Sequence, residues 1–179
     1  SEKTSYPKYD ICALEEKSKT TINNQDIEQL LQAIRQASRP LILAGGGVKI
    51  SESSSELKAF AHLQKIPVIA TMQAAGLMDS DDSLYLYNTG LDGAPKANNA
   101  IKDCDLLLCF GVRFSNYTIL DSQNFAPNAK IVNINIKEDE INRVIKSDIA
   151  IVADAKDVLK ALNNYPVIKD FSPWLNLID

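Results

Sequence analysis

The 179-residue sequence has few of the side chains on which catalytic sites commonly depend: it contains one histidine, His62, and three cysteines, Cys12, Cys104 and Cys109. Arrangements of the Ser/His/Asp or Cys/His type would all require that single histidine. It lies within an expected helix, and we interpret it as structural. The cysteines show no metal-ligand spacing, which is typical of proteins from a reducing cytoplasm. We therefore predict no catalytic residue and no metal site.

Basic clusters and long apolar runs are also missing. The net charge is −4 and the lysines and arginines are dispersed, which argues against nucleic acid and anionic membranes as partners. No apolar run approaches the roughly 20 residues that a membrane-spanning helix requires, and no secretory signal opens the chain. Asp79, Asp81 and Asp82 lack the spacing of a calcium loop and are expected in a solvated turn. We expect a cytoplasmic protein that binds neither nucleic acid nor membrane.

Short apolar runs alternate with helical patterns along the chain, in a composition typical of globular proteins. Strands are expected at residues 40–44, 67–70, 84–87, 106–110, 130–136 and 149–152. Helices are expected at residues 24–37, 53–64, 95–102 and 157–162, with a short one from residue 138. Runs without polar alternation indicate strands that are buried on both faces. We predict an α/β fold, a three-layer Rossmann-like domain with a six-stranded, mostly parallel sheet and helices on both faces.

The same pattern predicts one domain between two tails. Residues 1–22 are polar and irregular and are expected to form an N-terminal linker or arm, which either packs on a neighbour or stays unstructured. Residues 23–163 form the domain. Residues 164–179, which contain two prolines and the single tryptophan, are predicted to be a C-terminal linker. Helix starts are expected at Asn24 or Asp26, at a capping box from Ser53 to Glu56, and at Pro95.

The first expected strand runs directly into Gly45, Gly46 and Gly47. Glycine permits a sharp turn and a close approach of backbone N–H groups to a ligand, and a strand, such a turn and a helix start together favour anion binding. The fingerprint G-x-G-x-x-G is incomplete, because Ile50 occupies the position of its third glycine. The acidic residue that holds ribose in nicotinamide dehydrogenases is missing at residues 70–72. A Rossmann-type oxidoreductase is therefore disfavoured.

Five turns follow strand ends, at residues 45–47, 71–73, 90–93, 111–113 and 154–155. Ligands of open parallel sheets bind outside the carboxyl ends of the strands, so the five turns together predict one ligand groove. Arg113 would either contact a phosphate or flat ring or tie down its own loop. Asp154 would either accept a hydrogen bond from ribose or adenine or act as an ordinary helix N-cap.

Several segments, taken in order, resemble one family. They are residues 39–47, 66–71, 90–93 with 97–100, 104–108 with 111–114, 125–131 and 148–155. Their order and spacing, from about residue 25 to 162, resemble the central domain of thiamine diphosphate-dependent enzymes, in the branch of acetolactate synthase and pyruvate oxidase. The resemblance implies an excised middle domain, because the motifs with which the two outer domains bind thiamine diphosphate and Mg²⁺ have no counterpart here.

The resemblance also implies a nucleotide cofactor, since flavin-containing members hold FAD across the sheet edge and others hold ADP or no ligand. Carried over by position, the cofactor-binding residues would be Gly45, Gly46, Gly47, Thr71, Met72, Gln73, Gly90, Leu91, Gly93, Gly111, Arg113, Asn135, Ile136, Asp154 and Ala155. Thiamine diphosphate and Mg²⁺ would be bound only in the intact parent enzyme.

The chain departs from the family pattern at three places. Asp92 replaces a histidine, and Ser115 and Tyr117 stand where the synthases have aspartate and arginine. Asn135 and Lys137 replace two aspartates. Asn135 can replace one acceptor of ribose hydroxyls, whereas Lys137 cannot.

The resemblance implies the central domain of an acetolactate synthase-like 2-oxo acid carboligase or decarboxylase, with a structural and nucleotide-binding role. Its implied partners are FAD or ADP, the flanking thiamine-binding domains of the parent chain, and further copies in a homo-oligomer. A stand-alone nucleotide-binding or regulatory domain without catalysis is the alternative. Whether the chain is itself part of an enzyme stays open, because it lacks catalytic and thiamine-binding motifs.

Overall fold

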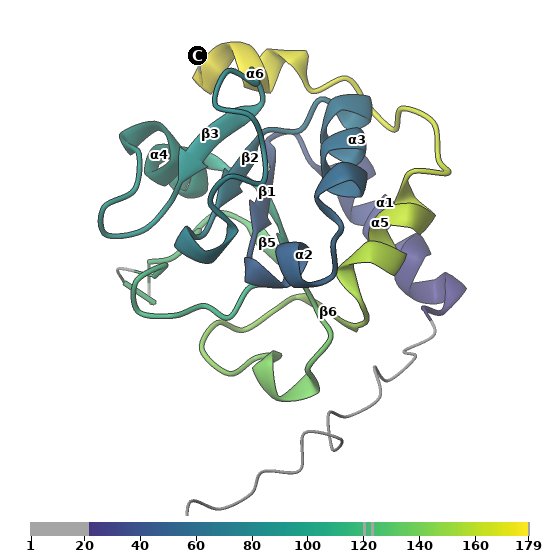
Figure 1. Ribbon diagram of the computed structural model, residues 1–179. Coiled ribbons are helices and arrows are strands. Elements are labelled where there is room, and N and C mark those ends of the chain that lie inside the picture. Colours follow the sequence, from purple (N-terminus) through teal and green to yellow (C-terminus); the bar gives the residue numbers. More distant parts are fainter. Residues whose placement is uncertain (1–21, 120, 123, 179) are drawn as a thin grey trace, which may run out of the picture.

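The computed structural model describes residues 22–119, 121–122 and 124–178, so the expected N-terminal arm lies outside the described residues except for Ile22 (Figure 1). One six-stranded sheet forms the centre, in the order β3-β2-β1-β4-β5-β6. The strands are β1 (Pro40–Ala44), β2 (Val68–Ala70), β3 (Tyr85–Asn88), β4 (Leu106–Phe110), β5 (Lys130–Asn135) and β6 (Ile149–Val152). Every neighbouring pair is parallel. The predicted fold is confirmed, with a sheet that is parallel throughout.

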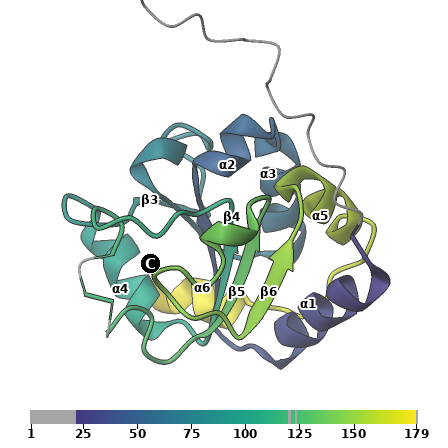
Figure 2. The same cartoon turned by 90° about the horizontal axis from the view of Figure 1, so that it is seen from below.

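Helices cover both faces of the sheet (Figure 2). One face packs against α1 (Asn24–Gln36), α3 (Ser54–Gln64) and α5 (Ala155–Leu162). The other packs against α4 (Pro95–Asp103), which begins at the predicted proline, and against the loop after β4. The short helices α2 (Gly46–Ile50), η2 (Met72–Ala74) and η3 (Glu138–Glu140) follow the ends of β1, β2 and β5. The central strands β1 and β4 are buried at every position, because both of their faces are covered.

Two helix starts differ from the expectation. Asn23, rather than Asn24 or Asp26, caps α1, and its side chain accepts a hydrogen bond from Asp26 N–H at 2.7 Å. Ser53 stands before α3, but its hydroxyl donates to Val48 O at 3.2 Å and makes no cap bond. The expected capping box is therefore absent, because Ser53 instead holds the end of α2 against the start of α3.

The C-terminal stretch, which was expected to be a linker, is packed onto the domain. It contains α6 (Ser172–Ile178), and Trp174 is buried with its indole N–H donating to Pro40 O at 2.9 Å. The Gln64 side chain accepts a hydrogen bond from Ile168 N–H at 2.8 Å, and Phe171 is buried in the core. The folded unit thus reaches beyond residue 163, and α6 lies at the amino end of the sheet (Figure 1).

Each helix in the described part of the chain is too short or too polar to cross a bilayer.

Replacing Trp174 tests how firmly this stretch is held. Trp174→Phe removes the indole hydrogen bond and part of the ring, so we expect the free energy of unfolding to fall by about 1–3 kcal/mol. Trp174→Ala should cost roughly 3–5 kcal/mol. Leu177, which is 69% exposed on the same helix, provides the control, since Leu177→Ala should change stability by no more than about 0.5 kcal/mol. Urea unfolding followed by circular dichroism measures all three, and equal costs for the two alanine variants would contradict the packing.

Candidate functional site

The strand order places the glycine turn at a switch point of the sheet. From β1 the chain proceeds outward to β2 and β3, and it then returns to β4, beside β1, before continuing to β5 and β6 on the other side. Connections that leave neighbouring strand ends in opposite directions open a crevice between them. The sequence predicts a helix only from Ser53, but α2 already begins at Gly46, with Gly45 as its N-cap residue.

The backbones of the two strand ends touch at this crevice. Gly47 N–H donates to Gly111 O at 3.1 Å, and Gly45 N–H donates to Phe110 O at 2.9 Å. A Cβ on Gly47 would lie 2.6 Å from Gly111 Cα, and a Cβ on Gly111, whose φ is +59°, would lie 2.6 Å from Gly47 Cα. Only glycine at both positions permits this contact.

Two cavities flank the contact along the carboxyl edge of the sheet. The first, here called the β2 cavity, has a volume of about 400 Å³ and is lined by Gly46, Gly47, Lys49, Ile50, Thr71, Gln73, Gly111, Arg113, Phe114, Ser115 and Thr118. The second, the β5 cavity, has a volume of about 230 Å³ and is lined by Gly47, Ile50, Ser51, Gly111, Arg113, Ile134, Asn135, Ile136, Lys137, Asp154 and Ala155. Because four residues line both, the cavities form one continuous depression, the edge groove.

Most of the predicted site residues meet in this groove. Those that line it are Gly46, Gly47, Thr71, Gln73, Gly111, Arg113, Asn135, Ile136, Asp154 and Ala155. Met72 and Leu91 lie beside it instead, in a hollow of about 40 Å³ that shares Thr118 with the β2 cavity. Four of the five predicted turns therefore converge on the groove, and the fifth adjoins it.

Three predicted residues line none of these cavities: Gly45, Gly90 and Gly93. Each packs against backbone. A Cβ on Gly93 would lie 2.6 Å from Thr89 C, and Gly93 N–H donates to Gly90 O at 3.0 Å. These glycines shape the turns that carry the lining residues.

The groove also contains residues outside the predicted set, namely Lys49, Ile50, Ser51, Phe114, Ser115, Thr118, Ile134 and Lys137. Ile50 and its neighbours line the groove because they belong to α2, the short helix that follows β1. The sequence did not predict this helix, because five residues are too few to show a helical periodicity. The signal that would have identified Ile50 is its position in the incomplete glycine fingerprint.

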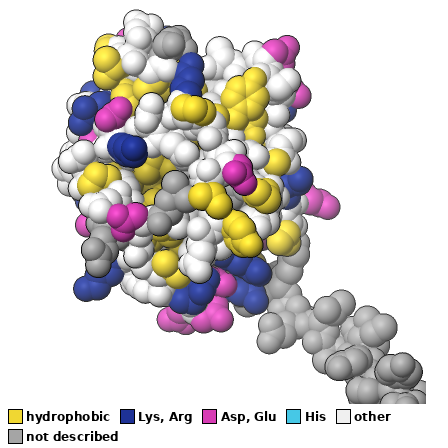
Figure 3. Space-filling model, turned by 90° about the vertical axis from the view of Figure 1, so that its left-hand side faces the viewer, with side chains coloured by type: hydrophobic (Ala, Val, Ile, Leu, Met, Phe, Trp, Pro, Cys, Tyr) yellow, Lys and Arg dark blue, Asp and Glu magenta, His cyan; other side chains and the backbone are white. Residues whose placement is uncertain are grey.

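Basic side chains outnumber acidic ones in the groove lining. Lys49, Arg113 and Lys137 come from segments that follow β1, β4 and β5, whereas Asp154 is the one carboxylate among the lining residues. Figure 3 shows Lys and Arg side chains beside acidic ones at the lower end of the molecule, where the carboxyl edge lies. The lining therefore favours an anionic ligand.

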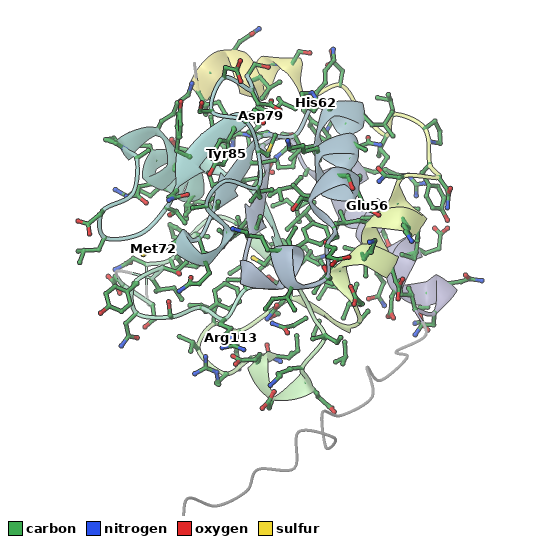
Figure 4. All side chains as sticks on the ribbon, viewed as in Figure 1. Glu56, His62, Met72, Asp79, Tyr85 and Arg113 are labelled. Carbon is green, nitrogen blue, oxygen red and sulfur yellow. The ribbon has the colours of Figure 1, made fainter. Side chains whose placement is uncertain are left out.

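Arg113 is held at the groove by an ion-pair network, and Figure 4 shows it at the carboxyl edge of the sheet. Its Nε lies 3.7 Å from Glu140 Oε1. Arg143 donates through Nε to Glu140 Oε2 at 2.8 Å and through its terminal nitrogen to Arg113 O at 2.9 Å. Both interpretations of Arg113 are compatible with this geometry, since the residue lines the groove and its own loop is tied down.

The polar groups Asp154 and Asn135 already serve the fold. The Asp154 side chain accepts a hydrogen bond from Lys156 N–H at 2.8 Å and so acts as the N-cap of α5. Asn135 donates through Nδ2 to Val112 O at 3.0 Å and accepts at Oδ1 from Lys137 N–H at 3.1 Å. These bonds fix the loops after β4 and β5 relative to each other.

His62 lies at the opposite end of the molecule from Arg113 (Figure 4). Its Nε2 is 2.8 Å from Asp82 Oδ2, and Lys58 pairs with Asp79 at 3.0 Å, so α3 is fastened to the turn before β3. Although burial opposes ionisation of Asp82, hydrogen bonds from Leu84 N–H and His62 hold its pKa below the usual value.

The two described cysteines are unreactive at neutral pH. Burial raises the pKa of the Cys104 thiol to about 12 and raises the pKa of Cys109 well above its usual value. Both thiols therefore stay protonated and pack as apolar groups in the core. Across the described residues, no three His, Cys, Asp or Glu side chains are grouped so that they would hold a metal ion.

The backbone contact at the switch point is testable with Gly111→Ala. The added methyl group would meet the Gly47 backbone in a positive-φ conformation, so we expect a loss of about 3 kcal/mol or more in the free energy of unfolding. Gly76→Ala is the matched control, because Gly76 also has a positive φ (+78°) but has nothing within 4 Å of the added Cβ. It should cost only the backbone strain, about 1–2 kcal/mol. Equal losses in urea unfolding would show that the contact is not tight.

The parallel sheet and the groove at its switch point define the class, a doubly wound α/β domain. The family model "Thiamine pyrophosphate enzyme, central domain" matches residues 27–162. The chain belongs to this family of central domains, as its resemblance to the family predicts.

The similar curated proteins are acetolactate synthases. The chain is 41% identical over 165 residues to the probable acetolactate synthase large subunit of Methanocaldococcus jannaschii, an alignment that covers 90% of this chain and 28% of that protein. It is 38% identical to the chloroplastic acetolactate synthase 1 of Oryza sativa subsp. japonica (86% and 24% covered). It is 32% identical to the acetolactate synthase large subunit of Corynebacterium glutamicum (89% and 26% covered). The chain spans about a quarter of the length of these relatives.

Proposed function

We propose that this chain is the nucleotide-binding central domain of an acetolactate synthase-like, thiamine diphosphate-dependent enzyme, and that the edge groove holds ADP or the ADP portion of FAD. One observation carries the proposal: most of the residues that the family resemblance assigns to a nucleotide line two adjoining cavities at the switch point. The two cavities share four lining residues and are lined by segments that follow strand ends, which is where doubly wound sheets bind nucleotides.

The β5 cavity suits the adenine base. Ile50 and Ile136 are 77% and 38% exposed, and both line this cavity with Ile134 and Ala155. Large exposed apolar side chains that converge on a cavity favour a ligand with an apolar surface. A purine between these side chains would cover them.

The β2 cavity suits the phosphates. Gly46 and Gly47 present backbone without side chains, and Lys49 and Arg113 supply positive charge. Lys49 is held in place, since its ammonium group donates to Ala75 O at 3.1 Å. A diphosphate would therefore lie beside the Gly47–Gly111 contact.

The far end of the groove distinguishes ADP from FAD. The hollow of about 40 Å³ beside the β2 cavity is too small to enclose a three-ring flavin. Met72, Leu91 and Tyr117 surround it and are 60%, 66% and 70% exposed. FAD would therefore place its flavin on an open apolar rim, whereas ADP would fit within the groove and, having no reactive group, would serve structure alone.

The parent enzyme is proposed from the family and from the greater length of the relatives. Flanking domains of the same chain would hold thiamine diphosphate and Mg²⁺, which supply the chemistry of decarboxylation and carboligation of 2-oxo acids. The parent would be a cytoplasmic homo-oligomer. The coding sequence on both sides of this segment should encode thiamine-binding motifs. Their absence would instead favour a stand-alone nucleotide-binding or regulatory domain.

Thermal unfolding with added nucleotide tests the groove. FAD or ADP at 100 times its dissociation constant should stabilise the chain by about 2.7 kcal/mol, which raises the melting temperature by roughly 5–10 °C. NAD should give a smaller shift.

A pair of variants tests where the nucleotide binds. Ile50→Asp places a negative charge among the apolar side chains of the β5 cavity and should abolish the shift in melting temperature. Val167→Asp is the control, because Val167 is 57% exposed and does not line the groove, and it should leave the shift unchanged. No shift with any nucleotide would contradict the proposed function.

A further inference from the structure

The one carboxylate that lines the β5 cavity already serves the fold. A free carboxylate commonly accepts hydrogen bonds from ribose hydroxyls, whereas a cation at the same place accommodates a ribose phosphate. Asp154, the one carboxylate among the lining residues, already accepts the Lys156 N–H as a helix cap. The Asn135 amide is likewise engaged, by Val112 O and by Lys137 N–H.

A cation lines the same cavity. Lys137 lies two residues after the end of β5 and lines the cavity, and its backbone N–H donates to the Asn135 side chain. Within the described part of the chain, its ammonium group makes no ion pair. Glu138 and Asp139 are exposed on the following turn and do not line the cavity. The positive charge of Lys137 is therefore available to a ligand.

A second cation faces the same cavity from the neighbouring strand. Arg113 follows β4 and lines the groove between the base-binding and phosphate-binding parts. Glu140 neutralises part of its charge, but Arg143 shares that carboxylate. The basic residues Arg113 and Lys137 outnumber the one carboxylate, Asp154, in the lining of this cavity, which therefore carries net positive charge.

We infer that the groove prefers an adenine nucleotide with a phosphate on its ribose, at the 2′ or 3′ hydroxyl, and that Lys137 is the residue that recognises this phosphate. The inference rests on the proposed function, because it assumes that the base lies in the β5 cavity. It adds the class of nucleotide: Lys137 forms a charge-assisted hydrogen bond with the ribose phosphate, and Arg113, which lines the same cavity, adds attraction.

Binding of matched nucleotides to the full 179-residue chain, measured by isothermal titration calorimetry at low ionic strength, tests the inference. The probes are AMP, ADP, adenosine 2′,5′-bisphosphate and adenosine 3′,5′-bisphosphate. One of the two bisphosphates should bind about tenfold more tightly than AMP, because it adds one charge-assisted hydrogen bond.

Two lysine variants, one at the start of β5 and one just after its end, distinguish specific recognition by Lys137 from a general effect of net charge. Lys137→Gln should remove most of the tenfold preference and lower the affinity for AMP by a smaller factor, because AMP loses only the general attraction of the charge. Lys130→Gln, at the amino end of β5 and away from the groove, should leave both affinities unchanged. An equal loss in the two variants would attribute the preference to net charge and overturn the role of Lys137.

The outcomes also separate this inference from the proposed function. If ADP binds but neither bisphosphate binds more tightly than AMP, the preference for a ribose phosphate is wrong and the nucleotide groove stands. If no nucleotide binds, both are wrong.

Discussion

The structure depends on the direct backbone contact between Gly47 and Gly111. It joins the end of β1 to the end of β4 by a hydrogen bond of 3.1 Å, at the one place where the sheet reverses its winding. Side chains on both strands are buried against helices or loops, so the strand ends cannot separate without exposing the core. Two residues without a Cβ thus bring two loops together and leave a cavity on either side.

The two ends of the sheet are held together by different contacts. At the amino end, Trp174 joins α6 to β1, and the His62–Asp82 pair joins α3 to the turn before β3. At the carboxyl end, Asp154 and Asn135 fix the loops, while Lys49, Arg113 and Lys137 place positive charge along the groove. Both ends therefore contribute to stability, and the carboxyl end also presents the positively charged groove.

The fold could be predicted because it follows from local sequence patterns. The features that the sequence did not predict depend on contacts between residues far apart in the chain. The six strands followed from apolar runs, and the glycine turn followed from Gly45 to Gly47. The packing of Trp174 did not, because its hydrogen-bond partner Pro40 lies 134 residues away. Nor did the sequence indicate that Asn133 would be fully buried with no hydrogen-bond partner for either side-chain polar atom. The position of the groove could be predicted from the ends of the strands. Its positive charge could not, because it depends on Lys49 in α2 and on Lys137 in the turn after β5.

The central claim is that the contact between two strand ends creates a nucleotide site. Nuclear magnetic resonance of the backbone amides during titration with ADP tests it most directly. The account predicts that the Gly46, Gly47 and Gly111 amides shift with a common dissociation constant, while the Gly76 amide and the Trp174 indole N–H do not move. Shifts confined to the Trp174 end of the sheet, or saturation with no change at the three glycines, would contradict it.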